Sequence, residues 1–240
     1  MRPTISRMYA ERLKETLPRV EERIARALER SGRIGPVRIV AVTKGHPAAA
    51  VSAAASAGLT DVGENRVQEL DAKRGELEGA DSAVTWHLIG HLQRNKARRA
   101  IQLFDRIHSI DSLRLAKELS SEAVRAGVTV RGLVQVNVSG EESKGGFDAD
   151  RAVSEIAQVA ALEAVRCEGL MTMAPFSADE DVVRATFIGA RELLERCARE
   201  GAGLQGAELS MGMSGDFEIA IEEGSTMLRL GTILFGERAQ

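Results

Sequence analysis

The alternation of short β-rich segments with longer amphipathic ones constrains the fold of this chain more than any other feature. Strands separated by helices pair in parallel through right-handed crossovers, and eight such units in 240 residues fit a closed barrel. We therefore predict an α/β fold, a single (β/α)8 TIM barrel. An open doubly wound sheet is the alternative, but its glycine-rich phosphate turn is missing after the first strand. The predicted strands span residues 37–44, 61–65, 85–90, 106–111, 131–138, 165–173, 207–213 and 226–235.

A charged amphipathic segment precedes the first strand. Its apolar residues recur at three- and four-residue steps, which predicts an extra N-terminal helix over residues 6–31. We expect residues 1–36 to form this helix and its lead-in, and residues 37–240 to form the barrel. No linker of low complexity divides the two, so we expect one domain overall.

Charge and composition exclude several classes of protein. With 32 basic and 35 acidic residues the net charge is −3, which gives no general attraction to nucleic acid or to an anionic membrane. No apolar run approaches the roughly 20 residues that span a bilayer, and no signal-peptide core is present. Cys167 and Cys197 are too isolated for a disulfide framework, and His87 and His91 lack a zinc-type glutamate between them. We expect a cytoplasmic protein without a metal.

Lys44 is the most informative polar residue at a strand end. It follows the apolar run 40–43 and shares strand parity with Val40 and Val42, so its side chain should face the barrel interior. Functional residues of parallel barrels lie at the carboxyl ends of the strands. Partial loss of hydration there favours the neutral amine, which is a nucleophile toward aldehydes. The alternative is a strand-end lysine that extends into solvent.

The last two predicted strands are followed by segments suited to a phosphate group, which barrels frequently bind at this place. Residues 210–215 offer the hydroxyls of Ser210 and Ser214 and backbone amides freed by glycine, and a helix beginning near Asp216 would add its N-terminal dipole. Gly231-Thr232 offers a second close backbone approach and a hydroxyl. The alternative is that these are ordinary turn residues with a helix cap.

Arg229 lies between two leucines of the last predicted strand, and a buried guanidinium needs a partner. One candidate partner is a carboxylate, such as Glu64 or Glu237. The other is an acceptor on a ligand, such as a ring nitrogen.

Eight motifs occur in order along the chain, and together they resemble one family. They are residues 40–44 (VAVTK), 63–69 (GENRVQE), 86–96 (WHLIGHLQRNK), 108–111 (HSID), 136–138 with 144–146 (VNV and KGG), 169–175 (GLMTMAP), 209–214 (LSMGMS), and 229–232 with 235–236 (RLGT and FG). This series resembles the pyridoxal 5′-phosphate (PLP) homeostasis proteins, once labelled alanine racemase-like. The resemblance runs from about residue 37 to residue 238.

The resemblance implies a cofactor site. In that family the lysine that matches Lys44 forms the internal aldimine, a Schiff base, with PLP. The arginine that matches Arg229 faces the pyridine nitrogen, and the asparagine that matches Asn65 lies beside the cofactor. The phosphate is held by the residues that match Ser210, Ser214, Gly231 and Thr232. Family members are mostly described as monomers without established turnover that act in vitamin B6 and amino-acid homeostasis.

The nature of Arg229 argues for a carrier rather than a strong enzyme. PLP is an effective electron sink when its ring nitrogen is protonated, a state that an acidic partner favours. A charged guanidinium cannot accept a hydrogen bond, so Arg229 should keep the nitrogen neutral. The chain also ends at Gln240, just past the last predicted strand, so we expect it to lack the β-domain that completes the active site of racemases. We therefore predict a PLP carrier or regulator that yields its cofactor to apo-enzymes.

Two other functions stay open. A weak PLP-dependent racemase or decarboxylase predicts substrate turnover that the change Lys44→Ala abolishes. A barrel lyase that forms its Schiff base with a phosphorylated sugar predicts a colourless protein that borohydride traps only with substrate.

Overall fold

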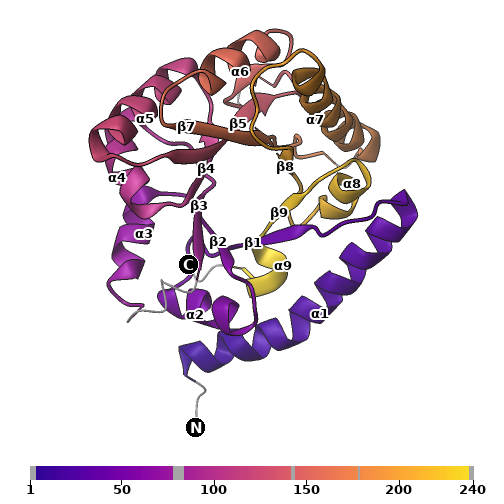
Figure 1. Cartoon of the computed structure of the whole chain (residues 1–240). Coiled ribbons are helices and arrows are strands. Elements are labelled where there is room, and N and C mark those ends of the chain that lie inside the picture. Colours follow the sequence, from indigo (N-terminus) through magenta and orange to yellow (C-terminus); the bar gives the residue numbers. More distant parts are fainter. Residues whose placement is uncertain (1–3, 78–83, 142–143, 178, 238–240) are drawn as a thin grey trace.

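The computed structural model describes residues 4–77, 84–141, 144–177 and 179–237. Eight parallel strands form a closed ring, in which β4 pairs with β3 on one side and with β5 on the other. The predicted TIM barrel is thus confirmed (Figure 1). The ring consists of β1 (Arg38–Val42), β2 (Asp61–Glu64), β3 (Thr85–Leu88), β4 (Arg106–Ile110), β5 (Val130–Asn137), β7 (Val165–Met171), β8 (Glu208–Ser210) and β9 (Met227–Leu230).

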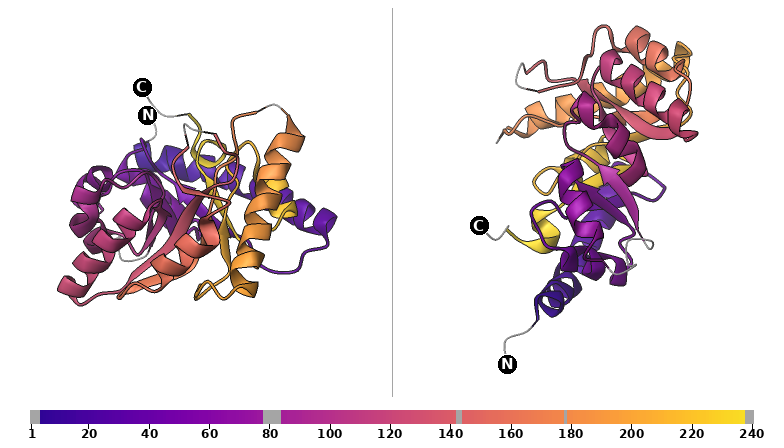
Figure 2. Two further views of the ribbon diagram at one scale, coloured as in Figure 1. Left: turned by 90° about the horizontal axis from the view of Figure 1, so that it is seen from above. Right: turned by 90° about the vertical axis from the view of Figure 1, so that its left-hand side faces the viewer.

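Helices cover the outside of the ring, and in side view the long helices α1 and α7 lie outside the strands (Figure 2). The helices are α1 (Ile5–Ser31), α2 (Ala48–Ser56), α3 (Val67–Arg74), α4 (Ala97–Leu103), α5 (Leu113–Ala126), α6 (Ala152–Ala160), α7 (Glu180–Arg199), α8 (Phe217–Glu222) and α9 (Thr232–Phe235), with a 3₁₀ turn at Arg94–Lys96. Among the described residues, no helix is long and apolar enough to cross a membrane.

The ends of several strands differ from the prediction. The last strand, predicted over residues 226–235, stops at Leu230, and residues 232–235 form the helix α9 instead. The backbone amides of Leu234 and Phe235 both donate to the carbonyl of Gly231, which closes a helical turn. A short apolar run cannot by itself distinguish a strand from a buried helix, which is why this part of the prediction was wrong. A two-residue strand, β6 (Phe147–Asp148), pairs with the end of β5 and was not predicted.

The N-terminal helix α1 packs against the barrel rather than standing apart from it. Its apolar stripe is buried, from Tyr9 through Leu13 and Leu17 to Ala27, and it contacts α2, α8 and α9. Arg23 adds a two-pronged ion pair with Glu218 of α8. The division into a lead-in over residues 1–36 and a barrel over residues 37–240 stays a prediction, but this packing ties the two together.

The interior of the barrel is polar, unlike the layers of branched aliphatic side chains that commonly fill such barrels. Val40 of β1 lies in register with Asp61 of β2 on one side and with Arg229 of β9 on the other. His87 and His108 are fully buried. Asp61, His87, His108 and Arg229 belong to one buried series of hydrogen bonds that runs through the barrel.

Candidate cofactor site

A cavity of about 330 Å³ opens at the carboxyl ends of the strands. Six of the seven predicted site residues line it: Lys44, Asn65, Ser214, Arg229, Gly231 and Thr232. The seventh, Ser210, is not part of the lining. The wall also contains residues that sequence reasoning did not select, namely His46, Ile89, Met173, Phe176, Met213 and Asp216.

Lys44 reaches the cavity because the alternation of β1 continues beyond its last ladder residue. Val42 lines the cavity, Thr43 is buried on the opposite side of the backbone, and Lys44 lines the cavity again, half-buried. The amide of Thr43 donates to the carbonyl of Gly63, which keeps the segment beside β2. Gly45 then turns the chain with φ +73°, a conformation that favours glycine.

Thr43 is held from outside the ring by a buried ion pair. Lys73 of α3 donates to the carbonyl oxygen of Thr43 at 2.7 Å and also to the carboxylate of Glu64, to which the Thr43 hydroxyl donates as well. Burial raises the pKa of the Glu64 carboxyl, and the charge of Lys73 opposes that rise. The arrangement fixes the residue next to Lys44, so the position of Lys44 depends on α3.

Arg229 projects into the cavity from β9, and Asp216 lines the same cavity. Its terminal nitrogens donate to the Ser210 hydroxyl at 2.8 Å and to the carbonyl oxygen of Thr172 at 3.0 Å. Glu64, one carboxylate considered as its partner, pairs with Lys73 instead, and among the described residues no carboxylate forms an ion pair with Arg229. Burial lowers the pKa of Arg229 to about 10, although the charge of Asp216 opposes that shift, so the guanidinium stays charged at neutral pH.

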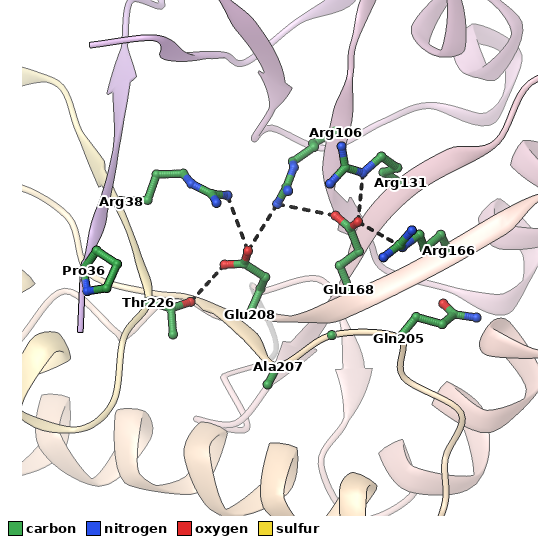
Figure 3. A pocket seen from close by; sticks show the side chains of 11 residues that line it. Pro36, Arg38, Arg106, Arg131, Arg166, Glu168, Gln205, Ala207, Glu208 and Thr226 are labelled. Atoms are coloured by element: carbon green, nitrogen blue, oxygen red, sulfur yellow. Dashed lines mark hydrogen bonds and ion pairs between the residues drawn. The ribbon is translucent and has the colours of Figure 1, made fainter. Parts of the chain in front are cut away.

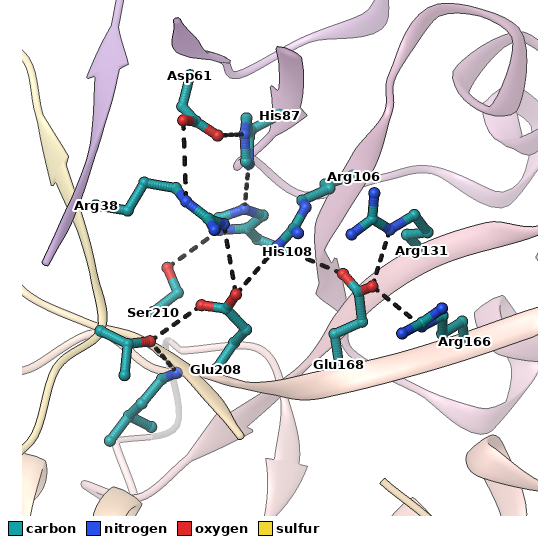
Figure 4. Close-up of polar contacts among 12 residues, drawn as sticks. Arg38, Asp61, His87, Arg106, His108, Arg131, Arg166, Glu168, Glu208 and Ser210 are labelled. Carbon is teal, nitrogen blue, oxygen red and sulfur yellow. Dashed lines mark hydrogen bonds and ion pairs between the residues drawn. The ribbon is translucent and has the colours of Figure 1, made fainter. Parts of the chain in front are cut away.

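Ser210 connects Arg229 to a buried chain of hydrogen bonds. Its Oγ lies 3.1 Å from Nδ1 of His108, Nε2 of His108 lies 2.8 Å from Nδ1 of His87, and Nε2 of His87 lies 2.8 Å from Asp61 (Figure 4). The two charged ends set one direction for the whole chain. Asp61 can only accept and Arg229 can only donate, so His87, His108 and Ser210 each donate toward Asp61.

Burial keeps His87 and His108, the two histidines of this series of hydrogen bonds, neutral. It lowers the pKa of His87, although the hydrogen bond from His87 to Asp61 opposes the shift. It lowers the pKa of His108 further, and the nearby His87 and Arg229 act in the same direction. A neutral imidazole has one donor and one acceptor, which is what a one-directional chain requires.

The two segments predicted to hold phosphate lie side by side. The amide of Ile233, in the first turn of α9, donates to the Ser214 hydroxyl at 3.3 Å. The Asp216 carboxylate accepts from the amide of Met213 at 2.6 Å and closes the turn that carries Ser214. The hydroxyls of Ser214 and Thr232 and the backbone at Gly231 therefore line one part of the cavity.

The helix α1 also supports the site, which the sequence did not indicate. The hydroxyl of Tyr9 lies 3.0 Å from Nδ1 of His46, and both rings pack against Phe235 of α9. The Thr16 hydroxyl donates to the carbonyl oxygen of Leu234 at 3.0 Å. Through these contacts α1 braces the turn after β1 and the turn after β9 together.

Other polar residues singled out by the sequence lie elsewhere. His91 contacts Asp111 at 2.8 Å, and Asn137 donates to the carbonyls of Glu141 and Lys144. Among the described residues, no cluster of three or more His, Cys, Asp or Glu could hold a metal ion.

Comparison with known proteins places this barrel in one class. The family described as "Alanine racemase, N-terminal domain" matches residues 16–239. The "Pyridoxal phosphate homeostasis protein" of Aquifex aeolicus is 40% identical over 225 residues, covering 93% of this chain and 97% of the relative. That of Pseudomonas aeruginosa is 41% identical over 225 residues, covering 93% and 95%. The chain belongs to the family of pyridoxal phosphate homeostasis proteins.

Solved structures agree with this assignment. PipY of Synechococcus elongatus, solved with PLP bound, is 41% identical and superposes with a TM-score of 0.78 over 89% of this chain and all of that one (100%). Alanine racemase of Clostridium difficile is 17% identical, with a TM-score of 0.74 over 96% of this chain and 60% of the racemase. The latter likeness shows the barrel fold alone.

Proposed function

We propose that this chain is a PLP carrier that holds the cofactor as a Schiff base on Lys44 and serves vitamin B6 and amino-acid homeostasis. The observation that carries the proposal is the meeting of Lys44, Arg229 and the Ser214/Gly231-Thr232 cradle in one cavity. A relative that is 41% identical has been solved with PLP bound.

The cavity residues fit the three functional ends of PLP. The Lys44 amine suits the aldehyde, while the Ser214 and Thr232 hydroxyls with the backbone at Gly231 suit the phosphate. The Arg229 guanidinium suits the ring nitrogen, and Asn65 lies in the same wall. When bound, PLP supplies a ring that withdraws electrons from an attached amino acid.

Ser210 has a different role from the one that the sequence suggests. It does not line the cavity, and its hydroxyl accepts from Arg229 while donating to His108. We assign Ser210 to the positioning of the guanidinium and leave the phosphate to Ser214, Gly231 and Thr232.

The charge of Arg229 favours a carrier over a strong catalyst. A charged guanidinium donates a hydrogen bond to the ring nitrogen and cannot accept one from it, so Arg229 favours the unprotonated nitrogen. Ser210 behind it accepts from Arg229 and donates to His108. An unprotonated ring nitrogen weakens the electron sink on which racemisation and decarboxylation depend.

The proposal also covers the oligomeric state and the cellular location of the protein. We expect a cytoplasmic monomer that meets apo-enzymes transiently. The exposed large apolar side chains among the described residues are scattered over α1, α5, α7 and separate loops, which supports a monomer. Size-exclusion chromatography with light scattering tests this directly.

A transfer assay separates the carrier from an enzyme. The PLP-loaded protein is mixed with an apo-form of a PLP enzyme, and the recovery of that enzyme's activity is followed against an equal amount of free PLP with a scavenger present. The carrier predicts protected transfer, and no racemisation of alanine by circular dichroism. Substrate turnover that disappears in Lys44→Ala would instead favour the weak racemase or decarboxylase.

A further inference from the structure

A second large cavity lies at the opposite end of the barrel, at the amino ends of the strands. Its volume is about 690 Å³, within the range of small-molecule sites, which is roughly 300–1,000 Å³. Its lining includes four arginines and two glutamates: Arg38, Arg106, Arg131, Arg166, Glu168 and Glu208 (Figure 3). We call this cavity the amino-terminal mouth.

The amino-terminal mouth has more positive than negative charge. Arg38 lies 3.9 Å from Asp61, so Asp61 is counted with the two glutamates of the lining. Four guanidinium groups then face three carboxylates, which leaves one positive charge in excess. His87, the next residue inward, adds no charge because burial lowers its pKa.

Two of the arginines lie directly opposite each other. Arg131 of β5 and Arg166 of β7 are partners in the strand register, a placement of like charges that is destabilising without a counterion. Glu168 supplies part of that counter-charge. It stands at the register shift between the two strands, where Gly132 pairs with Cys167 and Leu133 pairs with Gly169, and such a bulge redirects a side chain.

Glu168 makes its closest contact with the Nε of each of these two guanidinium groups. Its Oε1 lies 2.8 Å from Nε of Arg131 and 3.2 Å from Nε of Arg166. The terminal nitrogens of both arginines form the fork that binds oxyanions, and they donate no hydrogen bond to the described residues. Both side chains are about half exposed, at 46% and 54%, so a ligand can reach them.

Arg106 gives an independent indication of a ligand. Its side chain is 10% exposed, and Nη1 is fully buried without a hydrogen bond in the described structure. It forms ion pairs with Glu168 at 3.4 Å and with Glu208 at 3.5 Å, and neither contact is a hydrogen bond. A buried donor left unsatisfied is destabilising. Because this nitrogen is covered, an oxyanion in the cavity would satisfy it once the Arg106 side chain turns toward the ligand.

Small residues form the wall beside these arginines. Gly206 and Ala207 line the mouth, and a Cβ at Gly206 would lie 2.6 Å from the carbonyl oxygen of Glu168. The backbone at Gly206 therefore passes close to the backbone of Glu168, where a larger residue would not fit.

We infer that the amino-terminal mouth binds a compact oxyanion, either a phosphate group or a carboxylate, between the guanidinium groups of Arg106, Arg131 and Arg166. The site is separate from the cavity of Lys44. The buried chain from Asp61 to Arg229 links the two cavities.

Titration calorimetry of the cofactor-free protein with inorganic phosphate and with succinate tests this inference. We expect saturable binding of at least one of them, and which one binds distinguishes a phosphate ligand from a carboxylate. Loss of one charge-assisted contact in Arg166→Gln should weaken binding about tenfold. The exposed Arg98 provides a control of equal charge change, and Arg98→Gln should bind as the wild type does. Ser214→Ala separates this site from the cavity of Lys44 and should leave the binding at the mouth unchanged.

Amide chemical shifts provide a measurement that needs no variant. On titration with the anion that binds, the amides of Gly206 and Ala207 should shift along a saturable curve. Absence of saturable binding by both anions, or shifts confined to residues near Ser214 and Gly231, would overturn the inference. So would binding that Arg98→Gln weakens as much as Arg166→Gln.

Discussion

Nη1 of Arg229 donates to the hydroxyl of Ser210 at 2.8 Å, and this contact joins the cofactor cavity to the polar interior of the barrel. It makes Ser210 a support of the guanidinium, whereas Ser214 lines the cavity itself. The two serines of one short segment thus have different roles.

Ser210→Ala and Ser214→Ala should therefore have different effects. Ser210→Ala removes one of the two hydrogen bonds of Arg229 and the partner of His108 Nδ1, which should destabilise the fold by about 1–3 kcal/mol and lower Tm by a few degrees. Ser214→Ala should lower PLP affinity more and Tm less. Spectroscopic titration with PLP and calorimetric melting of both variants check this. Equal loss of PLP affinity in the two would place Ser210 on the phosphate.

Gly90→Ala should disturb the cavity through Asn65. A Cβ at Gly90 would lie 2.3 Å from the backbone oxygen of Asn65 and 2.6 Å from its side-chain oxygen, so the backbone must move. We expect lower Tm together with weaker PLP binding. Gly75→Ala is the matched control, because its φ is −65° and the nearest atom to a Cβ there is 3.5 Å away. Wild-type PLP affinity in Gly90→Ala would contradict the role given to Asn65.

Removing one partner of the buried Lys73–Glu64 ion pair should destabilise the protein more than removing both charges. Lys73→Met leaves the fully buried Glu64 carboxylate without its cation and should destabilise the protein by about 3–5 kcal/mol. Adding Glu64→Gln removes the unpaired charge and should restore much of that loss. Denaturant unfolding of the single and double variants measures both values. A double variant no more stable than Lys73→Met would show that the charge is not the cause.

The neutral histidines predict how stability depends on pH. Burial holds their pKa values in the folded protein below the ordinary histidine value of about 6.5, so near pH 6 the unfolded chain binds more protons than the folded one. Stability should therefore be complete above about pH 7 and fall as the pH drops below roughly 6.5. Asp61, Arg38, Arg106 and Arg229 are the charged groups that face the pair.

Melting temperatures between about pH 5 and pH 8 test this dependence. His108→Gln should have a lower Tm but a flatter profile than the wild type. The exposed His91 is the control, and His91→Gln should keep the wild-type slope. An unchanged slope in His108→Gln would assign the acid sensitivity to other groups.

The sequence predicted the barrel because eight alternating segments leave few topologies, and strand parity correctly placed Lys44 beside Val42. Contacts between residues far apart in the chain were not readable. Tyr9 meets His46, and His87 meets His108, only because the barrel closes, and no local pattern encodes either pair. The place of Ser210 was missed for a similar reason. Its hydroxyl could serve the cavity or the interior, and the position of Arg229 decides between them.

The end of the last strand shows a different limit. Residues 232–235 are apolar enough for a strand, and the turn at Gly231 makes them a helix that presents Thr232 to the cavity. The prediction of Gly231 and Thr232 as site residues did not depend on this boundary, because a strand end and a helix start occupy the same rim of the barrel.

The most direct test of the account is an absorption spectrum of the purified protein after incubation with PLP, recorded before and after borohydride. Wild type should show a visible band that reduction removes, and so should Lys117→Ala, which changes an exposed lysine of α5. Lys44→Ala should show no such band. A reducible band that persists in Lys44→Ala, or a wild type that stays colourless with PLP, would contradict the assignment of Lys44, and the second result would favour the phosphosugar lyase.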